Sequence, residues 1–156
     1  MRPYRVLLTG LLILVIELAA RSRSIPQPVP SDPAAAIDGT TNLPTSVLST
    51  LHRACFDCHS NATRWPWYAS LPGAAWLVGR DVHNGRGQLN FSRWTEYNKF
   101  DRADLLDKAC ELAAKRVMPL WQYRVVHPEA RLDAADIAAL CSWSRRESAR
   151  LTGDTP

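Results

Sequence analysis

The segment that decides the fold of this chain is Cys55-Phe56-Asp57-Cys58-His59. Two cysteines separated by two residues lie close together on a helical turn, where their thiols can add to the two vinyl groups of one porphyrin. The histidine that follows them then faces the iron. The motif therefore predicts that Cys55 and Cys58 form thioethers to one haem c, with His59 as the proximal iron ligand.

Three alternatives to a haem site are open at this point. A structural zinc site needs four ligands, but Cys110 and Cys141 are single and far downstream. A thioredoxin-like redox pair would lie in a βαβ pattern, which the sequence lacks. The third alternative is a chance occurrence of the pentapeptide. Export of the chain would weaken all three, because c-type haem is attached outside the cytoplasm.

An apolar stretch spans residues 6–20, follows two arginines and contains Glu17. This arrangement predicts an export signal in residues 1–23. The stretch is short for a permanent anchor, since a full crossing needs about 20 apolar residues. Cleavage of the leader and its retention in the inner membrane are both open, because small residues near 20 suit a peptidase and the arginines of 21–23 suit an anchor. Either outcome places the domain in the periplasm.

The positive charge of the chain is concentrated in this leader. The formal net charge is +4, and residues 1–24 hold four arginines beside a single acidic residue. The remainder is close to neutral and has no basic stripe of the kind that a phosphate backbone requires. We therefore expect no nucleic-acid partner.

Residues 24–44 contain five prolines among small and polar residues, which is the composition of an extended linker. The folded domain is predicted to span residues 45–150. Apolar residues recur there at helical spacing. One helix should begin at Thr45-Ser46 and run into Cys55. A second should span 101–116 with Asp101 as its cap, a third should begin at Asp133, and residues 74–82 should form a short helix. No segment alternates as a strand does, so the predicted fold is a single all-α domain.

Met118 is the predicted distal iron ligand, because Pro119 holds it extended just past the end of a helix. A thioether there can reach the opposite face of the haem from His59. His83 and His127 are alternative ligands, whereas His52 lies about one turn before Cys55 and is badly placed. A methionine that only packs in the core is the remaining alternative.

Cys110 and Cys141 fall on the apolar faces of the two late helices. Because the exported compartment is oxidising, we predict a disulfide between them, worth roughly 3 kcal/mol in the chain-entropy model. Two buried free thiols are the alternative.

Beyond the pentapeptide, residues 45–145 resemble the bacterial haem-binding-domain family of small c-type cytochromes. The resemblance implies an all-helical, cytochrome c-like domain in which Cys55 and Cys58 hold the haem, His59 ligates it and Met118 is the matching distal candidate. Residues 114–117 depart from the family pattern, which often has an acidic, glycine-containing turn there. The residues that carry the resemblance are 55–61, Thr63-Arg64-Trp65-Pro66-Trp67-Tyr68, Leu89-Asn90-Phe91-Ser92, Trp94, Met118-Pro119, Tyr123, His127-Pro128, Leu132 and Trp143.

A porphyrin needs a large apolar enclosure, and aromatic rings supply it. The residues expected to line the haem are Trp65, Trp67, Tyr68, Trp76, Trp94 and Trp121. Arg64, Arg80 and Arg86 are candidates to bind its propionates.

The expected function is one-electron transfer in the periplasm with redox proteins as partners. We expect no enzymatic activity, because the sequence has no second catalytic constellation. The alternatives are a haem-based sensor that binds a small ligand, and a small haem peroxidase with His83 or His127 as its proton-transferring group.

Overall fold

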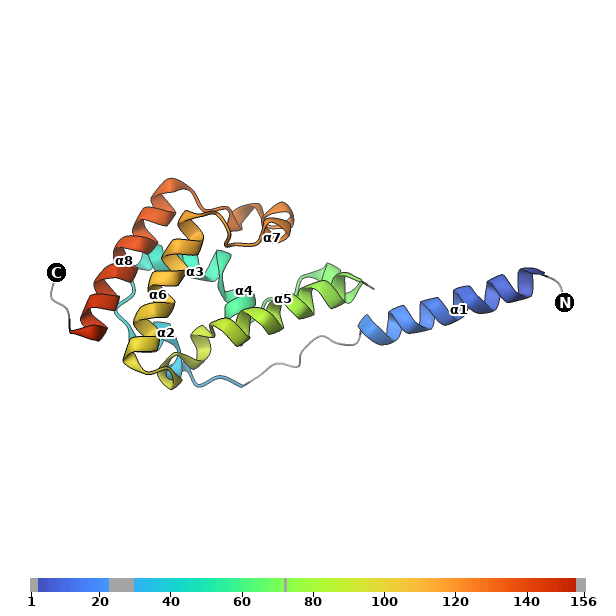
Figure 1. The fold of residues 1–156 in the computed structure, drawn as a ribbon, viewed down its shortest axis with the longest axis horizontal. Coiled ribbons are helices and arrows are strands. Elements are labelled where there is room, and N and C mark those ends of the chain that lie inside the picture. The colour runs from blue at the N-terminus through green and yellow to red at the C-terminus, as the bar shows by residue number, and fades with distance from the viewer. Residues whose placement is uncertain (1–2, 23–29, 72, 154–156) are drawn as a thin grey trace.

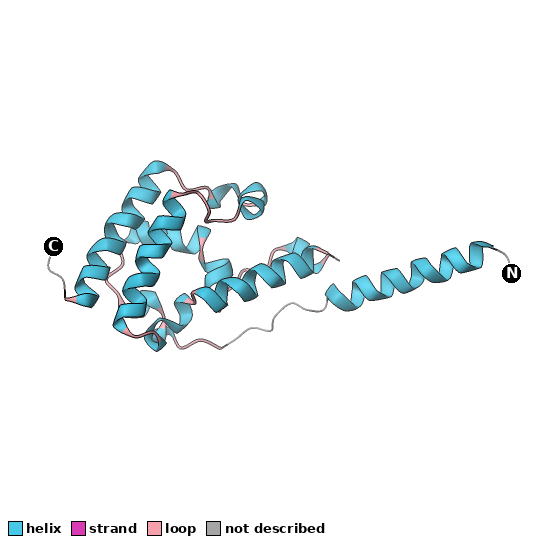
Figure 2. Ribbon diagram, viewed as in Figure 1, coloured by secondary structure: helices cyan, strands magenta, loops and turns pink. Residues whose placement is uncertain are grey.

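The computed structural model describes residues 3–22, 30–71 and 73–153, and over these residues it is helical without a strand (Figures 1 and 2). The predicted all-α class is therefore confirmed. In chain order, with η marking a 3-10 helix, the elements are α1 (Pro3–Ser22), η1 (Pro33–Ala35), α2 (Ile37–Thr40), α3 (Thr45–Ala54), α4 (Phe56–His59), η2 (Trp67–Ser70), α5 (Ala74–Gln88), η3 (Phe91–Glu96), α6 (Lys99–Ala114), α7 (Trp121–Val126), η4 (Pro128–Ala130) and α8 (Ala134–Thr152).

The two longest helices of the domain, α6 and α8, pack side by side and form its base (Figure 1). A disulfide between Cys110 and Cys141 joins them, with 4.8 Å between the two Cα atoms. This pairing fits the usual geometry of disulfides and uses the two late cysteines. They are therefore not available as zinc ligands beside Cys55 and Cys58.

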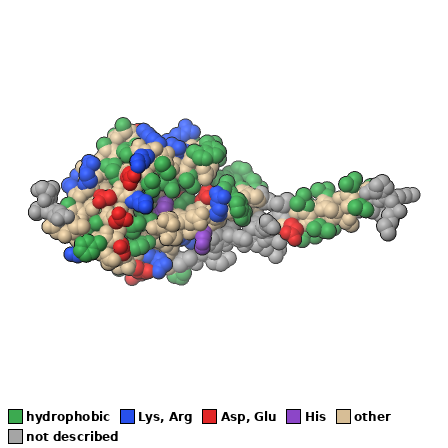
Figure 3. All heavy atoms as spheres, viewed as in Figure 1, with side chains coloured by type: hydrophobic (Ala, Val, Ile, Leu, Met, Phe, Trp, Pro, Cys, Tyr) green, Lys and Arg blue, Asp and Glu red, His purple; other side chains and the backbone are tan. Residues whose placement is uncertain are grey.

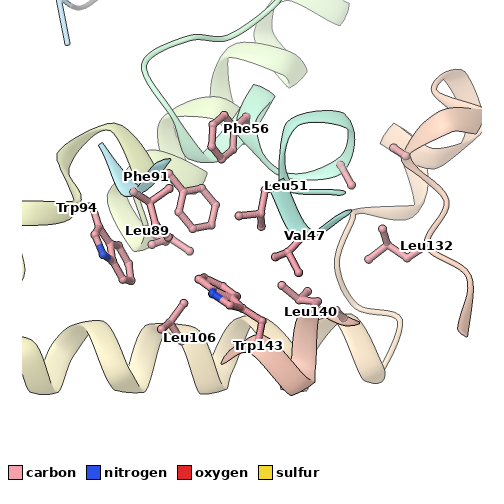
Figure 4. Packing of buried hydrophobic residues seen from close by; sticks show 14 residues of the cluster. Val47, Leu51, Phe56, Leu89, Phe91, Trp94, Leu106, Leu132, Leu140 and Trp143 are labelled. Carbon is pink, nitrogen blue, oxygen red and sulfur yellow. The ribbon is translucent and has the colours of Figure 1, made fainter. Parts of the chain in front are cut away.

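The hydrophobic core lies between this helix pair and α3, α4 and η3 (Figure 4). Trp143 of α8 and Leu106 of α6 face Trp94 and Phe91 of η3, and Phe91 in turn stacks on Phe56 at 5.3 Å between ring centroids. Packing on α3 follows its helical period, because Val47, Thr50, Leu51 and Ala54 are its buried residues. The core therefore reaches directly to α4, which carries the second half of the cysteine motif.

Part of the predicted linker is folded, which corrects the expected start of the domain at residue 45. Residues 33–40 form η1 and α2, and both elements contact η3. The side chain of Ile37 is 0% exposed and belongs to the core. Burial of this one aliphatic side chain outweighs the extended tendency of the surrounding prolines. The part of the linker at 24–29 lies outside the described residues.

The helix starts show how capping side chains set the boundaries. Asp133 caps α8 as predicted, and it forms a capping box with Asp136. The predicted cap of α6 was wrong, because the Asn98 side chain accepts hydrogen bonds from the backbone N–H groups of Phe100 and Asp101. The helix therefore begins at Lys99, and Asp101 lies within its first turn.

The large apolar side chains of α1 are exposed, and the helix extends away from the rest of the domain (Figure 3). Within the described part of the chain, no helix combines the length and the apolar character needed to cross a membrane.

The end of α6 explains the departure from the family pattern at residues 114–117. Arg116 has φ 59°, in the left-handed region that favours glycine. The backbone N–H of Val117 donates to the Leu112 carbonyl at 3.0 Å and that of Arg116 to Ala113, which together make a Schellman motif. The Arg116 guanidinium also donates to the Leu132 carbonyl.

We expect Arg116→Gly to be more stable than Arg116→Ala by about 1 kcal/mol, because only alanine retains the Cβ that strains this conformation. Both variants lose the contact to Leu132, so that contact cancels in the comparison. The free energies of unfolding in urea measure the difference. Equal values would contradict a strained Arg116.

Candidate functional site

The cysteine motif forms the turn between α3 and α4. Cys55 separates the two helices, and its carbonyl accepts from the backbone N–H groups of Cys58 at 3.2 Å and His59 at 2.9 Å. This turn places the two cysteines and the histidine in one compact unit. Within the described chain, Cys55 and Cys58 are free thiols and both are half-buried.

The ring of His59 is fixed in orientation by one hydrogen bond. Its Nδ1 lies 3.1 Å from the Leu89 carbonyl oxygen, which can only accept, so Nδ1 carries the proton. The remaining lone pair is then on Nε2, the nitrogen that would bind a metal. Burial lowers the pKa of His59, which keeps the imidazole neutral at pH 7. His59 is therefore prepared as an iron ligand.

Helix α5 crosses directly over this turn, and it is longer than the predicted 74–82. It continues to Gln88 because Gly85 allows a close approach to α4. A Cβ built on Gly85 would lie 2.5 Å from the Cys58 carbonyl oxygen. A side chain at this position would push α5 away from the turn, so a residue that looks like a helix breaker in the sequence is required by packing.

Asp57, between the two cysteines, is buried and links the turn to two distant residues. Its carboxylate accepts from the Arg64 side chain at 3.1 Å and from the Tyr123 hydroxyl at 2.6 Å. Burial, followed by the hydrogen bond to Asp57, raises the pKa of Tyr123, so the phenol stays protonated and donates. This role of Tyr123 could not be predicted from the sequence, because 66 residues separate it from Asp57.

The three arginines proposed to bind propionates each have a partner in the protein. Arg64 pairs with Asp57, and Arg80 pairs with Asp81 and lies over the ring of Trp76. Arg86 donates to the Ser60 carbonyl at 2.8 Å and to the Thr63 hydroxyl at 2.9 Å. Arg86 thus holds the loop that follows the cysteine motif.

The alternative histidine ligands are placed differently from Met118. His127 has both ring nitrogens in contacts, with the Tyr68 hydroxyl at 2.8 Å and with Glu129 at 2.9 Å. His83 is exposed on α5, and His52 packs on Phe56 at 4.3 Å between ring centroids. None of these arrangements leaves a histidine oriented as a ligand in the way that His59 is.

Met118 lies half-buried between α6 and α7, and the next residue, Pro119, is buried. Its backbone N–H donates to the Leu112 carbonyl at 3.1 Å, which fixes it at the end of α6. Three residues later α7 begins, which the sequence did not predict. The contact from α7 to Asp57 ties the segment after Met118 to the turn that carries His59.

The family model described as the haem-binding domain matches residues 11–146, which is most of the chain. The chain belongs to the haem-binding domain family. No curated protein and no solved structure matches it.

The aromatic residues of this haem-binding domain fall into two groups. Trp94 is 0% exposed and packs between Phe91 and Tyr97, so its predicted place in the haem lining was wrong. Its side chain is enclosed by protein on all sides, which leaves no face for a porphyrin. By contrast, Trp67, Trp76 and Trp121 are 78%, 54% and 70% exposed. Trp65 and Tyr68 lie half-buried.

The residues present fit a haem. The unit of Cys55, Cys58 and His59 offers two thiols and one oriented imidazole on a single turn. The exposed Trp67, Trp76 and Trp121 could supply part of the apolar surface that a porphyrin requires.

We expect both motif thiols of the haem-free domain to react slowly with iodoacetamide at pH 8. Burial raises the pKa of Cys55 to about 12 and that of Cys58 to about 11, and only the thiolate reacts. Against an unfolded thiol with a pKa of about 8.5, the rate should fall about a hundredfold or more. Because the folded state keeps both thiols protonated, their contribution to the free energy of unfolding is fully present below about pH 8.5, the pKa of an unfolded thiol. It is lost as the pH rises through the pKa values of the two thiols in the folded state.

Mass spectrometry of the quenched reaction measures both rates, and the same chain in urea is the control. Equal rates in buffer and in urea would show that α4 does not pack around the thiols without haem.

Proposed function

We propose that this haem-binding domain is a monohaem c-type cytochrome that carries single electrons in the periplasm. Cys55 and Cys58 would hold the haem covalently, and His59 and Met118 would bind its iron. The observation that best supports this proposal is the hydrogen bond from His59 Nδ1 to Leu89, which presents Nε2 from the same turn as two free thiols.

The bound haem supplies a one-electron couple between ferric and ferrous iron. The protein residues orient it and exclude water. Leu89 keeps the His59 ring in one tautomer, which raises its basicity as a ligand. The thioether of Met118 would bind the iron and would raise the reduction potential relative to harder donors. A protein of this kind transfers electrons to redox partner proteins and transforms no substrate of its own.

The proposal includes export by residues 1–23, since thioethers to haem are formed outside the cytoplasm. The disulfide between α6 and α8 also suits an oxidising compartment.

The optical spectrum of the full chain, expressed in a host that matures c-type cytochromes, tests the proposal. We expect a sharp reduced α-band, the weak long-wavelength ferric band of methionine-ligated haem, and slow binding of carbon monoxide to the reduced protein. Haem that dissociates on denaturation would refute covalent attachment. Covalent haem without the ferric band, with fast binding of carbon monoxide, would refute Met118 as ligand.

One observation favours a second candidate, a small haem peroxidase. Glu129 contacts Nδ1 of His127, which is the orientation that a proton-transferring histidine needs. However, Tyr68 occupies the other ring nitrogen. A peroxidase would bind carbon monoxide rapidly and oxidise phenols with peroxide, and His127→Ala would remove that activity. The electron-carrier proposal predicts neither rapid binding of carbon monoxide nor oxidation of phenols.

A further inference from the structure

We propose that Tyr123 is a positioning residue for Met118. Through its hydrogen bond to Asp57, it holds the segment that follows Met118 against the turn that carries His59. The inference rests on the proposed function, because it takes Met118 as the distal ligand. It assigns to Tyr123 the control of how readily that ligand leaves the iron.

The contact itself is short and joins the two sides of the site. The Tyr123 hydroxyl lies 2.6 Å from Oδ2 of Asp57, and Asp57 is only 7% exposed. A hydroxyl that donates to a carboxylate makes a strong hydrogen bond, and low solvent exposure strengthens it further. Arg64 binds the same carboxylate and keeps it in place. Cys58 and His59 follow Asp57 directly, so the contact reaches the haem-attachment turn without an intermediate residue.

Helix α7 is attached by polar contacts and by partial packing of the Tyr123 ring against the core. None of the six residues of α7, all of which are described, is buried. Besides Tyr123, the amide of Gln122 donates to Asp81 of α5 at 3.2 Å. The ring of Tyr123 also stacks on His127 at 4.3 Å between ring centroids, and His127 in turn contacts Tyr68. Because α7 buries little apolar surface, loss of its strongest polar contact should loosen it.

Met118 is anchored upstream by the end of α6 and downstream by the buried Pro119 and by α7. The backbone N–H groups of Val117 and Met118 both donate to the Leu112 carbonyl at the end of α6. Downstream, Pro119 and Leu120 lead directly into α7. With the upstream end fixed, the position of the Met118 thioether follows the position of α7.

Tyr123→Phe in the haem-loaded full chain tests the proposal, because it removes the hydroxyl and keeps the ring. We expect carbon monoxide to associate with the reduced protein about tenfold faster or more, since a hydrogen bond to a charged group typically contributes that much to an equilibrium. The ferric methionine band should weaken and the reduction potential should fall. Amide hydrogen exchange should become faster in residues 120–126.

Ser148→Ala is the matched control. The Ser148 hydroxyl also donates to a carboxylate, that of Asp107 at 3.1 Å, but between α6 and α8. This variant should leave the association rate and the potential unchanged. A Tyr123→Phe protein with unchanged rate, band and potential would overturn the proposal, as would an equal change in both variants, which would indicate a general loss of stability.

Measurements on the protein without substitutions distinguish failure of this inference from failure of the proposed function. Fast binding of carbon monoxide and no methionine band before any substitution would reject Met118 as ligand. If the wild-type protein binds carbon monoxide slowly and the Tyr123→Phe variant binds it equally slowly, only the positioning role is rejected.

Discussion

The variant with both Cys55→Ala and Cys58→Ala should contain no haem that survives denaturing electrophoresis. The two thiols are the only atoms of the motif that can form thioether bonds, and both lie on the turn that carries His59. Haem staining of the gel and the intact mass of the purified chain measure the loss. Haem-stained protein of the correct size would refute covalent attachment at this motif.

The matched control replaces the other two cysteines, Cys110 and Cys141, with alanine. This variant loses the disulfide between α6 and α8 and should be less stable by roughly 3 kcal/mol. It should nevertheless retain covalent haem, because the helix pair lies on the side of the core away from α4. Each single variant, Cys55→Ala or Cys58→Ala, should retain one thioether and an altered α-band.

Trp94→Ala should lower the free energy of unfolding by about 3 to 5 kcal/mol. The indole is fully enclosed, and its ring centroid lies 6.4 Å from that of Phe91 and 6.0 Å from that of Tyr97. Its removal leaves a cavity in the middle of the packed core. Unfolding in urea, followed by far-UV circular dichroism, measures the change.

Phe100→Ala provides the comparison for this core substitution, because Phe100 is 61% exposed at the start of α6. Its cost should stay within about 0.5 kcal/mol. Trp94→Phe should fall between the two variants, since no described residue accepts a hydrogen bond from the indole N–H. Equal stabilities for Trp94→Ala and Phe100→Ala would contradict the assigned core.

Local sequence signals predicted a large part of this fold. The apolar period of α3 and the cap of α8 depend on residues within a few positions of each other, as with Asp133 and Asp136, and both helices were found where expected. The predicted cap at Thr45-Ser46 was wrong, because Pro44 precedes α3 and no side chain caps it. The cysteine motif and His59 are equally local. Their chemistry follows from spacing along one turn.

The features that were missed depend on contacts between distant residues. From the sequence alone Gly85 resembles a helix breaker, and only the structure shows that it packs against Cys58. Likewise, Ile37 resembles part of a linker, and only the structure shows that it is buried. The short helix α7 has no buried face and therefore no apolar period to detect. Neither residue spacing nor composition indicates the contact of Tyr123 with Asp57.

The unequal distribution of buried side chains has a consequence for the order in which the domain folds. The disulfide-linked pair of α6 and α8 packs with α3 and η3 around a continuous core, whereas α7 adds no buried residue among those described. We therefore expect this half to form first and the segment from Met118 through α7 to dock last.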